Sequence, residues 1–158
     1  MNKALIPLFI SLFLISCNAQ KIERIAFYNV ENLFDTINGP NNDEEFLPTG
    51  KKEWNSKRYN TKINHINQII CELKTPMLIG LCEIENKQVI QDIINNNKKL
   101  KHYKSIHFNS LDARGIDVGL IYHTKKLTLL DKGIIRFNLP EQDTPTSRDI
   151  LWAKFSYK

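Results

Sequence analysis

The feature that most constrains the fold is a short, uninterrupted apolar run at residues 77–82 (MLIGLC). Such a run is typical of a strand that is buried on both faces of a sheet. It follows residues 57–73, where apolar side chains recur at three- and four-residue steps, so this segment predicts a helix with one apolar face. Asn55 and Ser56 can cap the start of this helix, and Thr75-Pro76 ends it.

An earlier segment completes a strand–helix–strand unit. Residues 22–30 (IERIAFYNV) predict the first strand, whereas residues 32–55 are loop-like, with a strong break at residues 39–43 (GPNND). Two strands that are joined through a helical crossover run parallel in one sheet. A second helix is expected over residues 87–95, which carry four apolar side chains at helical spacing.

The helical periodicity disappears after the asparagine run at residues 95–97. Short strands separated by short loops are expected at residues 103–108, 116–122, 127–130, 134–137 and 150–156. A strand–helix–strand unit followed by consecutive strands predicts an α+β fold, with a mixed sheet and helices on one of its faces.

The composition is that of a globular protein, with 42% hydrophobic and 25% charged residues. It excludes a disordered chain, a collagen-like repeat and a multi-span membrane protein. Lys and Arg outnumber Asp and Glu by 22 to 17, which gives a net charge of +5. A basic balance favours attraction to phosphate-rich partners but does not identify one.

The N-terminus predicts an export signal over residues 1–17. Lys3 is followed by an apolar run at residues 4–15 that is shorter than the roughly 20 residues needed to span a bilayer. Residues 14–17 (LISC) resemble the bacterial lipobox, in which Cys17 becomes the lipidated first residue. Residues 17–19 (CNA) offer a competing site for ordinary signal peptidase. We therefore expect a membrane-anchored lipoprotein of a bacterial envelope, or otherwise a periplasmic or secreted protein.

The two other cysteines, Cys71 and Cys82, lie in apolar segments without CxxC or Cys/His metal spacing. We expect them to be small, buried side chains rather than disulfide partners or metal ligands.

Two polar residues stand at the ends of the two parallel strands. Asn29 lies near the end of the first, and Glu83 directly follows the apolar run. Open sheets bind ligands beyond the carboxyl ends of their strands, so an amide and a carboxylate are expected side by side at this edge. That pair suits a hard cation such as Mg²⁺ and a phosphate oxygen. On position alone, turn and surface roles are the commoner explanation.

Five blocks of sequence surround these positions in a fixed order. They are residues 28–35 (YNVENLFD), 43–54 (DEEFLPTGKKEW), 80–86 (GLCEIEN), 114–122 (RGIDVGLIY) and 147–151 (SRDIL). Together they resemble the endonuclease/exonuclease/phosphatase superfamily, and the second block resembles the acidic insertion of its bacterial secreted branch. The resemblance extends from about residue 24 to residue 155.

The resemblance implies a metal-dependent phosphodiesterase with a four-layer α/β/β/α sandwich fold. It implies that Asn29 and Glu83 are the catalytic and metal-site residues. Glu83 would be the Mg²⁺ ligand and Asn29 the strand-end asparagine that positions the metal and the catalytic acids, with Mn²⁺ or Ca²⁺ as alternative cations. Arg114 and Arg148 are candidate phosphate contacts, because a guanidinium fork suits phosphate oxygens. A turn residue and a surface ion-pair partner are the equal alternatives for these two. Asp117 is expected to fill a polar slot within its strand.

The superfamily also uses residues from the later half of its sequence, an Asp-Asn pair and a late Asp-His pair. Neither a Gly-Asp-x-Asn motif nor a late Asp-His pair follows residue 155. We therefore expect residues 22–158 to be the N-terminal portion of the domain, inactive alone, from an enzyme that hydrolyses phosphodiester bonds, with nucleic acid as the favoured substrate. The alternatives are a phosphatase or sphingomyelinase-type enzyme of the same superfamily and a non-enzymatic surface lipoprotein that serves as a binding module.

Overall fold

The computed structural model describes residues 22–136 and 148–158. The predicted export signal and Cys17 lie outside these residues. No helix in the described part of the chain is both long and apolar enough to cross a membrane.

Strands and helices follow one another in nearly the predicted order. The described residues form β1 (Ile25–Leu33), α1 (Ser56–Glu72), β2 (Leu78–Ile84), α2 (Lys87–Asn95), β3 (Tyr103–His107), β4 (Asp117–His123), β5 (Leu127–Ile135) and β6 (Ile150–Tyr157), with 3-10 turns at Glu44–Phe46 and Lys98–Leu100.

The main sheet has the strand order β1-β2-β4-β3. β1 and β2 run parallel, with the α1 crossover between them, while β4 is antiparallel to both β2 and β3. The sheet is therefore mixed, as predicted. Its parallel register aligns Asn29 with Cys82, so the carboxyl ends of β1 and β2 lie at the same edge.

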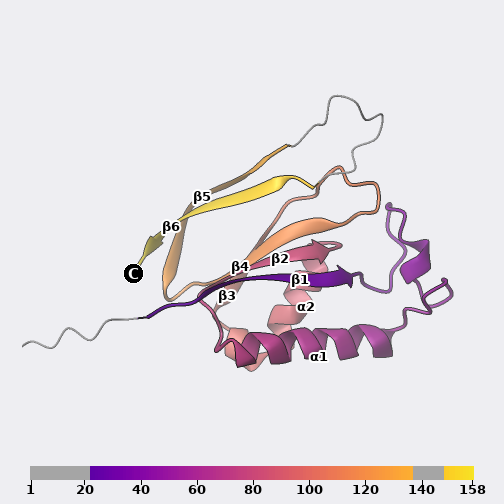
Figure 1. The fold of residues 1–158 in the computed structure, drawn as a ribbon, viewed down its shortest axis with the longest axis horizontal. Coiled ribbons are helices and arrows are strands. Elements are labelled where there is room, and N and C mark those ends of the chain that lie inside the picture. Colours follow the sequence, from indigo (N-terminus) through magenta and orange to yellow (C-terminus); the bar gives the residue numbers. More distant parts are fainter. Residues whose placement is uncertain (1–21, 137–147) are drawn as a thin grey trace, which may run out of the picture.

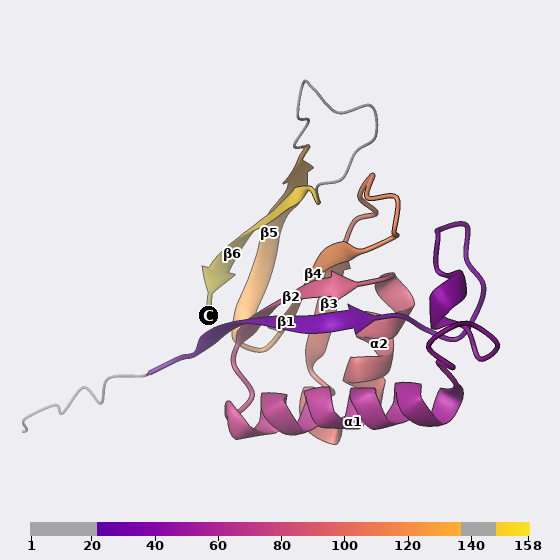
Figure 2. The ribbon, with the colours of Figure 1, turned by 45° about the vertical axis from the view of Figure 1, so that its right-hand side comes forward.

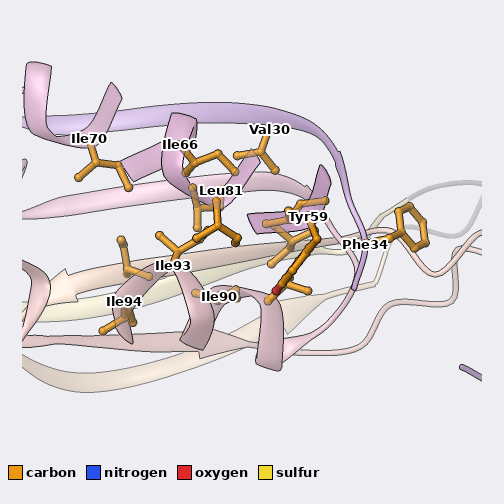
Figure 3. Close-up of a cluster of buried hydrophobic side chains, with 14 of the residues drawn as sticks. Val30, Phe34, Tyr59, Ile66, Ile70, Leu81, Ile90, Ile93 and Ile94 are labelled. Atoms are coloured by element: carbon orange, nitrogen blue, oxygen red, sulfur yellow. The ribbon is translucent and has the colours of Figure 1, made fainter. Parts of the chain in front are cut away.

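Both helices lie on one face of this sheet (Figures 1 and 2). Figure 3 shows the core between these layers, in which Ile66 and Ile93 from the two helices meet Val30 and Leu81 from the sheet. Burial of one such side chain contributes about 1.5–3 kcal/mol. Each helix begins at an asparagine cap: the Asn55 Oδ1 atom accepts a hydrogen bond from the Arg58 backbone N–H at 3.1 Å, and Asn86 caps α2 in the same way.

The last two strands form a separate antiparallel hairpin on the opposite side of the sheet from the helices (Figure 2). The prediction of two short strands at residues 127–130 and 134–137 is wrong, because β5 runs unbroken from Leu127 to Ile135. A bulge between Leu129 and Asp131 accommodates the polar interruption. Gly133 is not a turn residue: a Cβ atom there would lie 2.8 Å from the Trp152 ring.

The hairpin covers only part of the second sheet face. Ile25 and Phe27 of β1 are 67% and 73% exposed, and an apolar groove lined by Leu78, Leu120 and Leu151 runs between the sheet and the hairpin. The β2 side chains on this face are consequently only half-buried.

The two thiols lie on different elements, Cys71 on α1 and Cys82 on β2. Cys71 and Cys82 are free, as predicted. Both are only half-buried, however, so the expectation of full burial is wrong. Cys82 lies on the β2 face toward the groove, and the Cys71 Sγ atom accepts a hydrogen bond from Asn97 Nδ2 at 3.5 Å.

Candidate functional site

The structure brings Asn29 and Glu83 into contact at the carboxyl ends of β1 and β2. The Asn29 Nδ2 atom donates a hydrogen bond to Glu83 Oε1 at 3.0 Å. A second hydrogen bond fixes the orientation of the Asn29 amide, because its Oδ1 atom accepts from the Glu31 backbone N–H at 2.9 Å. Asn29 therefore presents a donor, and not its oxygen, to the carboxylate.

Both strands leave regular geometry at this point. The register shifts between Asn29 and Leu33 in β1, and between Cys82 and Ile84 in β2. Glu31, Asn32 and Glu83 adopt positive φ angles of 55°, 60° and 65°. Left-handed backbone at non-glycine residues costs on the order of 1–3 kcal/mol each and is concentrated at functional sites. Bulges of this kind redirect side chains, here turning Glu83 toward the end of β1.

The β1 bulge also supplies a second donor to Glu83. The Asn32 backbone N–H donates to Glu83 Oε2 at 3.1 Å, while Asn29 occupies Oε1. Each carboxylate oxygen thus accepts one neutral hydrogen bond and keeps lone-pair capacity for a cation. The two hydrogen bonds therefore orient the carboxylate through neutral donors and leave its charge in place.

One of the two candidate arginines lies beside this carboxylate. Arg148, just before β6, places Nη2 3.9 Å from Glu83 Oε1. Its side chain is 27% exposed, and its buried Nε has no hydrogen-bond partner within the described residues. The guanidinium therefore keeps donor capacity at the site.

Arg114 is held elsewhere. Its Nη2 atom lies 3.0 Å from Asp112 Oδ2 and its Nε donates to Asp112 Oδ1 at 3.2 Å, while the side chain is 59% exposed. Hydrogen bonding to Asp112 raises the pKa of Arg114 above its ordinary value. Burial acts in the opposite direction on Asp112, but its hydrogen bonds from Arg114 hold the pKa of that carboxyl below its usual range. This is the ion-pair arrangement that the sequence left as an alternative.

Asp117 fills a polar slot at the start of β4, as expected. It is 4% exposed, its Oδ1 atom accepts a hydrogen bond from the Ser110 backbone N–H at 2.8 Å, and its Oδ2 lies 2.8 Å from His107 Nε2. One carboxylate oxygen is thus occupied by the last residue of β3 and the other by the loop between β3 and β4.

Sequence reasoning missed the second acid of the GLCEIEN block, Glu85. It is 5% exposed, and its Oε2 atom accepts a hydrogen bond from the Asp35 backbone N–H at 2.7 Å. Burial, together with the nearby carboxylates of Asp35 and Asp43, raises the pKa of Glu85 to about 7. The sequence did contain a signal for its burial, because core residues lie before it, at Ile84, and after it, in α2. Glu85 holds the loop after β1 against the end of β2.

Sequence reasoning also missed Lys62 on α1. Its ammonium donates to the backbone carbonyls of Glu31 and Asn32, which belong to the β1 bulge. Burial lowers the pKa of Lys62 below its ordinary value, against the opposing charges of Glu31 and Glu83. No sequence signal marks this lysine, because it lies among other polar residues of an amphipathic helix.

The donor set fits a hydrated Mg²⁺ better than an enclosed ion. Within residues 22–136 and 148–158, no group of three or more His, Cys, Asp or Glu side chains is arranged to hold a metal. Mg²⁺ usually keeps several waters and uses one or two carboxylates. Glu83, with two oriented oxygens that retain lone pairs, meets that requirement.

Known proteins are similar to this chain in sequence pattern and in fold. Residues 24–158 match the model of a family described as the Endonuclease/Exonuclease/phosphatase family. None of the curated proteins matches the sequence.

Three solved structures resemble it at low identity. A family protein from Bacteroides thetaiotaomicron, described as endonuclease/exonuclease/phosphatase, is 18% identical, with a TM-score of 0.53 over 85% of this chain and 43% of that one. The endonuclease/exonuclease/phosphatase from Bacteroides vulgatus is 17% identical (TM-score 0.48; 84% and 45% covered). A functionally unknown conserved protein from Enterococcus faecalis V583 is 16% identical (TM-score 0.46; 84% and 46% covered). The chain thus spans less than half the length of these structures.

Proposed function

Because this chain belongs to the endonuclease/exonuclease/phosphatase family, we propose that it contributes the metal-binding part of a site for Mg²⁺-dependent hydrolysis of phosphodiester bonds. The observation that carries the proposal is the contact between Asn29 and Glu83, at the carboxyl ends of two parallel strands and beside Arg148. Nucleic acid is the favoured substrate class.

Glu83 is the proposed ligand of Mg²⁺, with Mn²⁺ or Ca²⁺ as substitutes. When bound, such a cation neutralises phosphate charge and stabilises the leaving oxygen. For Asn29 we propose an orienting role towards the Glu83 carboxylate in place of metal ligation. The hydrogen bonds of its amide support this role, because Nδ2 donates to Glu83 and Oδ1 accepts from the Glu31 N–H.

Arg148 is the proposed contact to the substrate phosphate. Its guanidinium lies 3.9 Å from Glu83, so a phosphate oxygen near the metal would also be within reach of its N–H donors. We prefer Arg148 to Arg114, because Asp112 engages two nitrogen atoms of the Arg114 guanidinium.

We propose that hydrolysis needs further residues of a longer protein. The chain spans 43–46% of the lengths of the similar structures, and the β1 side chains Ile25 and Phe27 leave an apolar face open beside the site. We also propose export through residues 1–17 and attachment to a membrane surface through Cys17, on the sequence pattern alone. A Cys17→Ser variant that still incorporates labelled fatty acid would contradict the anchor.

The activity is tested with the full-length protein. Plasmid DNA, sphingomyelin and phosphoinositides are incubated with wild type and with Glu83→Gln, each with Mg²⁺ and with EDTA. We expect DNA cleavage by the wild type in Mg²⁺ only, and a loss of at least about 100-fold in Glu83→Gln. Cleavage of lipid head groups without DNA cleavage would replace the nuclease by a sibling phosphoesterase. The absence of all three activities would favour a binding module.

A further inference from the structure

A lysine side chain from helix α1 binds the backbone of the β1 bulge. Lys62 of α1 reaches the edge of the sheet and donates from Nζ to the backbone carbonyl of Glu31, and also to that of Asn32 at 3.4 Å. Both residues have left-handed backbone, with φ angles of 55° and 60°. Hydrogen bonds from a cation are stronger than neutral ones, so this contact offsets part of the cost of the unusual conformation.

The backbone that Lys62 holds is the one that contacts Glu83. The Asn32 N–H donates to Glu83 Oε2 at 3.1 Å, and the Glu31 N–H donates to Asn29 Oδ1 at 2.9 Å. The Asn32 N–H belongs to the same peptide group as the Glu31 carbonyl that Lys62 binds, and the Glu31 N–H belongs to the preceding peptide group. Lys62 acts on the carboxylate through one short backbone segment.

Lys62 is itself fixed in place. Its ammonium lies 5.6 Å from the centroid of the Trp54 ring, within the range of a cation–π contact. Trp54 is 7% exposed, and its Nε1 atom donates to the Phe34 carbonyl at 2.9 Å. The aromatic core beneath the loop after β1 thus sets the position of the ammonium, and α1 sets the position of its stem.

We propose that Lys62 is a positioning residue for Glu83, holding the β1 bulge so that the Asn32 N–H fixes the metal-binding orientation of the carboxylate. This inference rests on the proposed metal-binding role of Glu83. Without the ammonium, the Glu31 and Asn32 carbonyls lose their donor, the bulge relaxes, and Glu83 loses one of its two oriented hydrogen bonds. Residues that orient a metal ligand in this way typically change metal affinity by about 10- to 100-fold.

The test uses the full chain and three lysine variants: Lys62→Met keeps the apolar stem, Lys62→Arg keeps a cation, and Lys57→Met removes an exposed lysine from the same helix. Mn²⁺ affinity is measured by calorimetry, and hydrogen exchange of the Asn32 amide is measured by NMR in metal-free protein. We expect Lys62→Met to lower Mn²⁺ affinity about 10-fold and to lose protection at Asn32. Lys62→Arg should retain most of both, and Lys57→Met should match the wild type.

The two proposals fail in different ways. Wild-type protection of the Asn32 amide in Lys62→Met overturns the positioning role, whatever the metal does. Wild-type Mn²⁺ affinity in Lys62→Met also overturns it when Glu83→Gln abolishes binding. If Glu83→Gln itself keeps wild-type affinity, the proposed function fails at its metal site, and the Asn32 amide still decides whether Lys62 holds the bulge.

Discussion

Asn29 donates a hydrogen bond to Glu83 across 3.0 Å, although 54 positions separate the two residues in the sequence. The contact follows from the parallel pairing of β1 and β2, which puts the carboxyl ends of both strands at one edge. The same edge receives Arg148 from the segment before β6. Three distant parts of the sequence therefore meet around one carboxylate.

Replacing Asn29 should weaken metal binding more than folding. Asn29→Ala removes the donor to Glu83 Oε1 and the acceptor of the Glu31 N–H, so the carboxylate loses one of its two fixed contacts. We expect about a 10-fold loss of Mn²⁺ affinity by calorimetry. Asn60→Ala, at an exposed position of α1, is the matched control and should change nothing. Equal affinities for the two variants would remove Asn29 from the site.

The two arginines should differ in phosphate binding. Arg148→Met removes a guanidinium that lies beside Glu83, whereas Arg114→Met removes one that is paired with Asp112. In fluorescence anisotropy with a short single-stranded oligonucleotide at fixed salt, we expect about a 10-fold loss of affinity for Arg148→Met and a loss within about twofold for Arg114→Met. The reverse ranking would contradict the assignment of Arg148.

Asp117 should matter for stability rather than for the metal. Asp117→Ala leaves the Ser110 N–H and His107 Nε2 without the partner that both have in the folded protein. Leaving buried polar groups unpaired costs about 1–3 kcal/mol each, so we expect a loss of about 2–4 kcal/mol in the free energy of unfolding by urea. A stable variant with weakened Mn²⁺ binding would instead give Asp117 a functional role.

His123 should make the fold sensitive to mild acid. Burial lowers its pKa below the ordinary 6.5, and the charges of Lys126 and His102 act in the same direction. The unfolded chain then binds this proton more readily than the folded chain. The stabilisation is therefore fully present above pH 6.5 and is lost as the pH falls through the folded pKa.

This dependence is measured as urea midpoints between about pH 7.5 and about pH 5. His123→Gln should lose less stability on acidification than the wild type, because the variant has no imidazole to protonate. His65→Gln, on the exposed side of α1, is the control and should follow the wild type. Parallel curves for wild type and His123→Gln would show that His123 does not contribute.

Patterns with a strong period were sufficient to predict the strand–helix–strand unit. The isoleucines of α1 at helical spacing and the apolar run of β2 fix a parallel pair, and the proximity of Asn29 and Glu83 follows from that pair alone. The hairpin was predicted less well. A glycine such as Gly133 is typical of a break between strands, but in β5 it lies within the strand and leaves room for the Trp152 ring. Whether a glycine ends a strand or admits a ring depends on its cross-strand partner, which the local sequence does not contain.

The details of the site were beyond sequence reasoning for a related reason. Of the three residues with positive φ, only Asn32 belongs to a residue type that is enriched there, and nothing in the local sequence marks Glu31 or Glu83. Tertiary contacts impose that backbone, including the ammonium of Lys62. Lys62 and Glu85 were missed because their roles depend on which face of an element packs against the β1 loop.

The central claim is that a divalent cation binds at the Asn29–Glu83 contact. It is tested most directly by titrating Mn²⁺ into the protein and following paramagnetic broadening of its NMR signals. The account predicts saturable broadening that begins at the Asn29 side-chain amide and the Asn32 N–H, both of which donate to Glu83, and that disappears in Glu83→Gln. Broadening that begins elsewhere, or that is unchanged in Glu83→Gln, would contradict it.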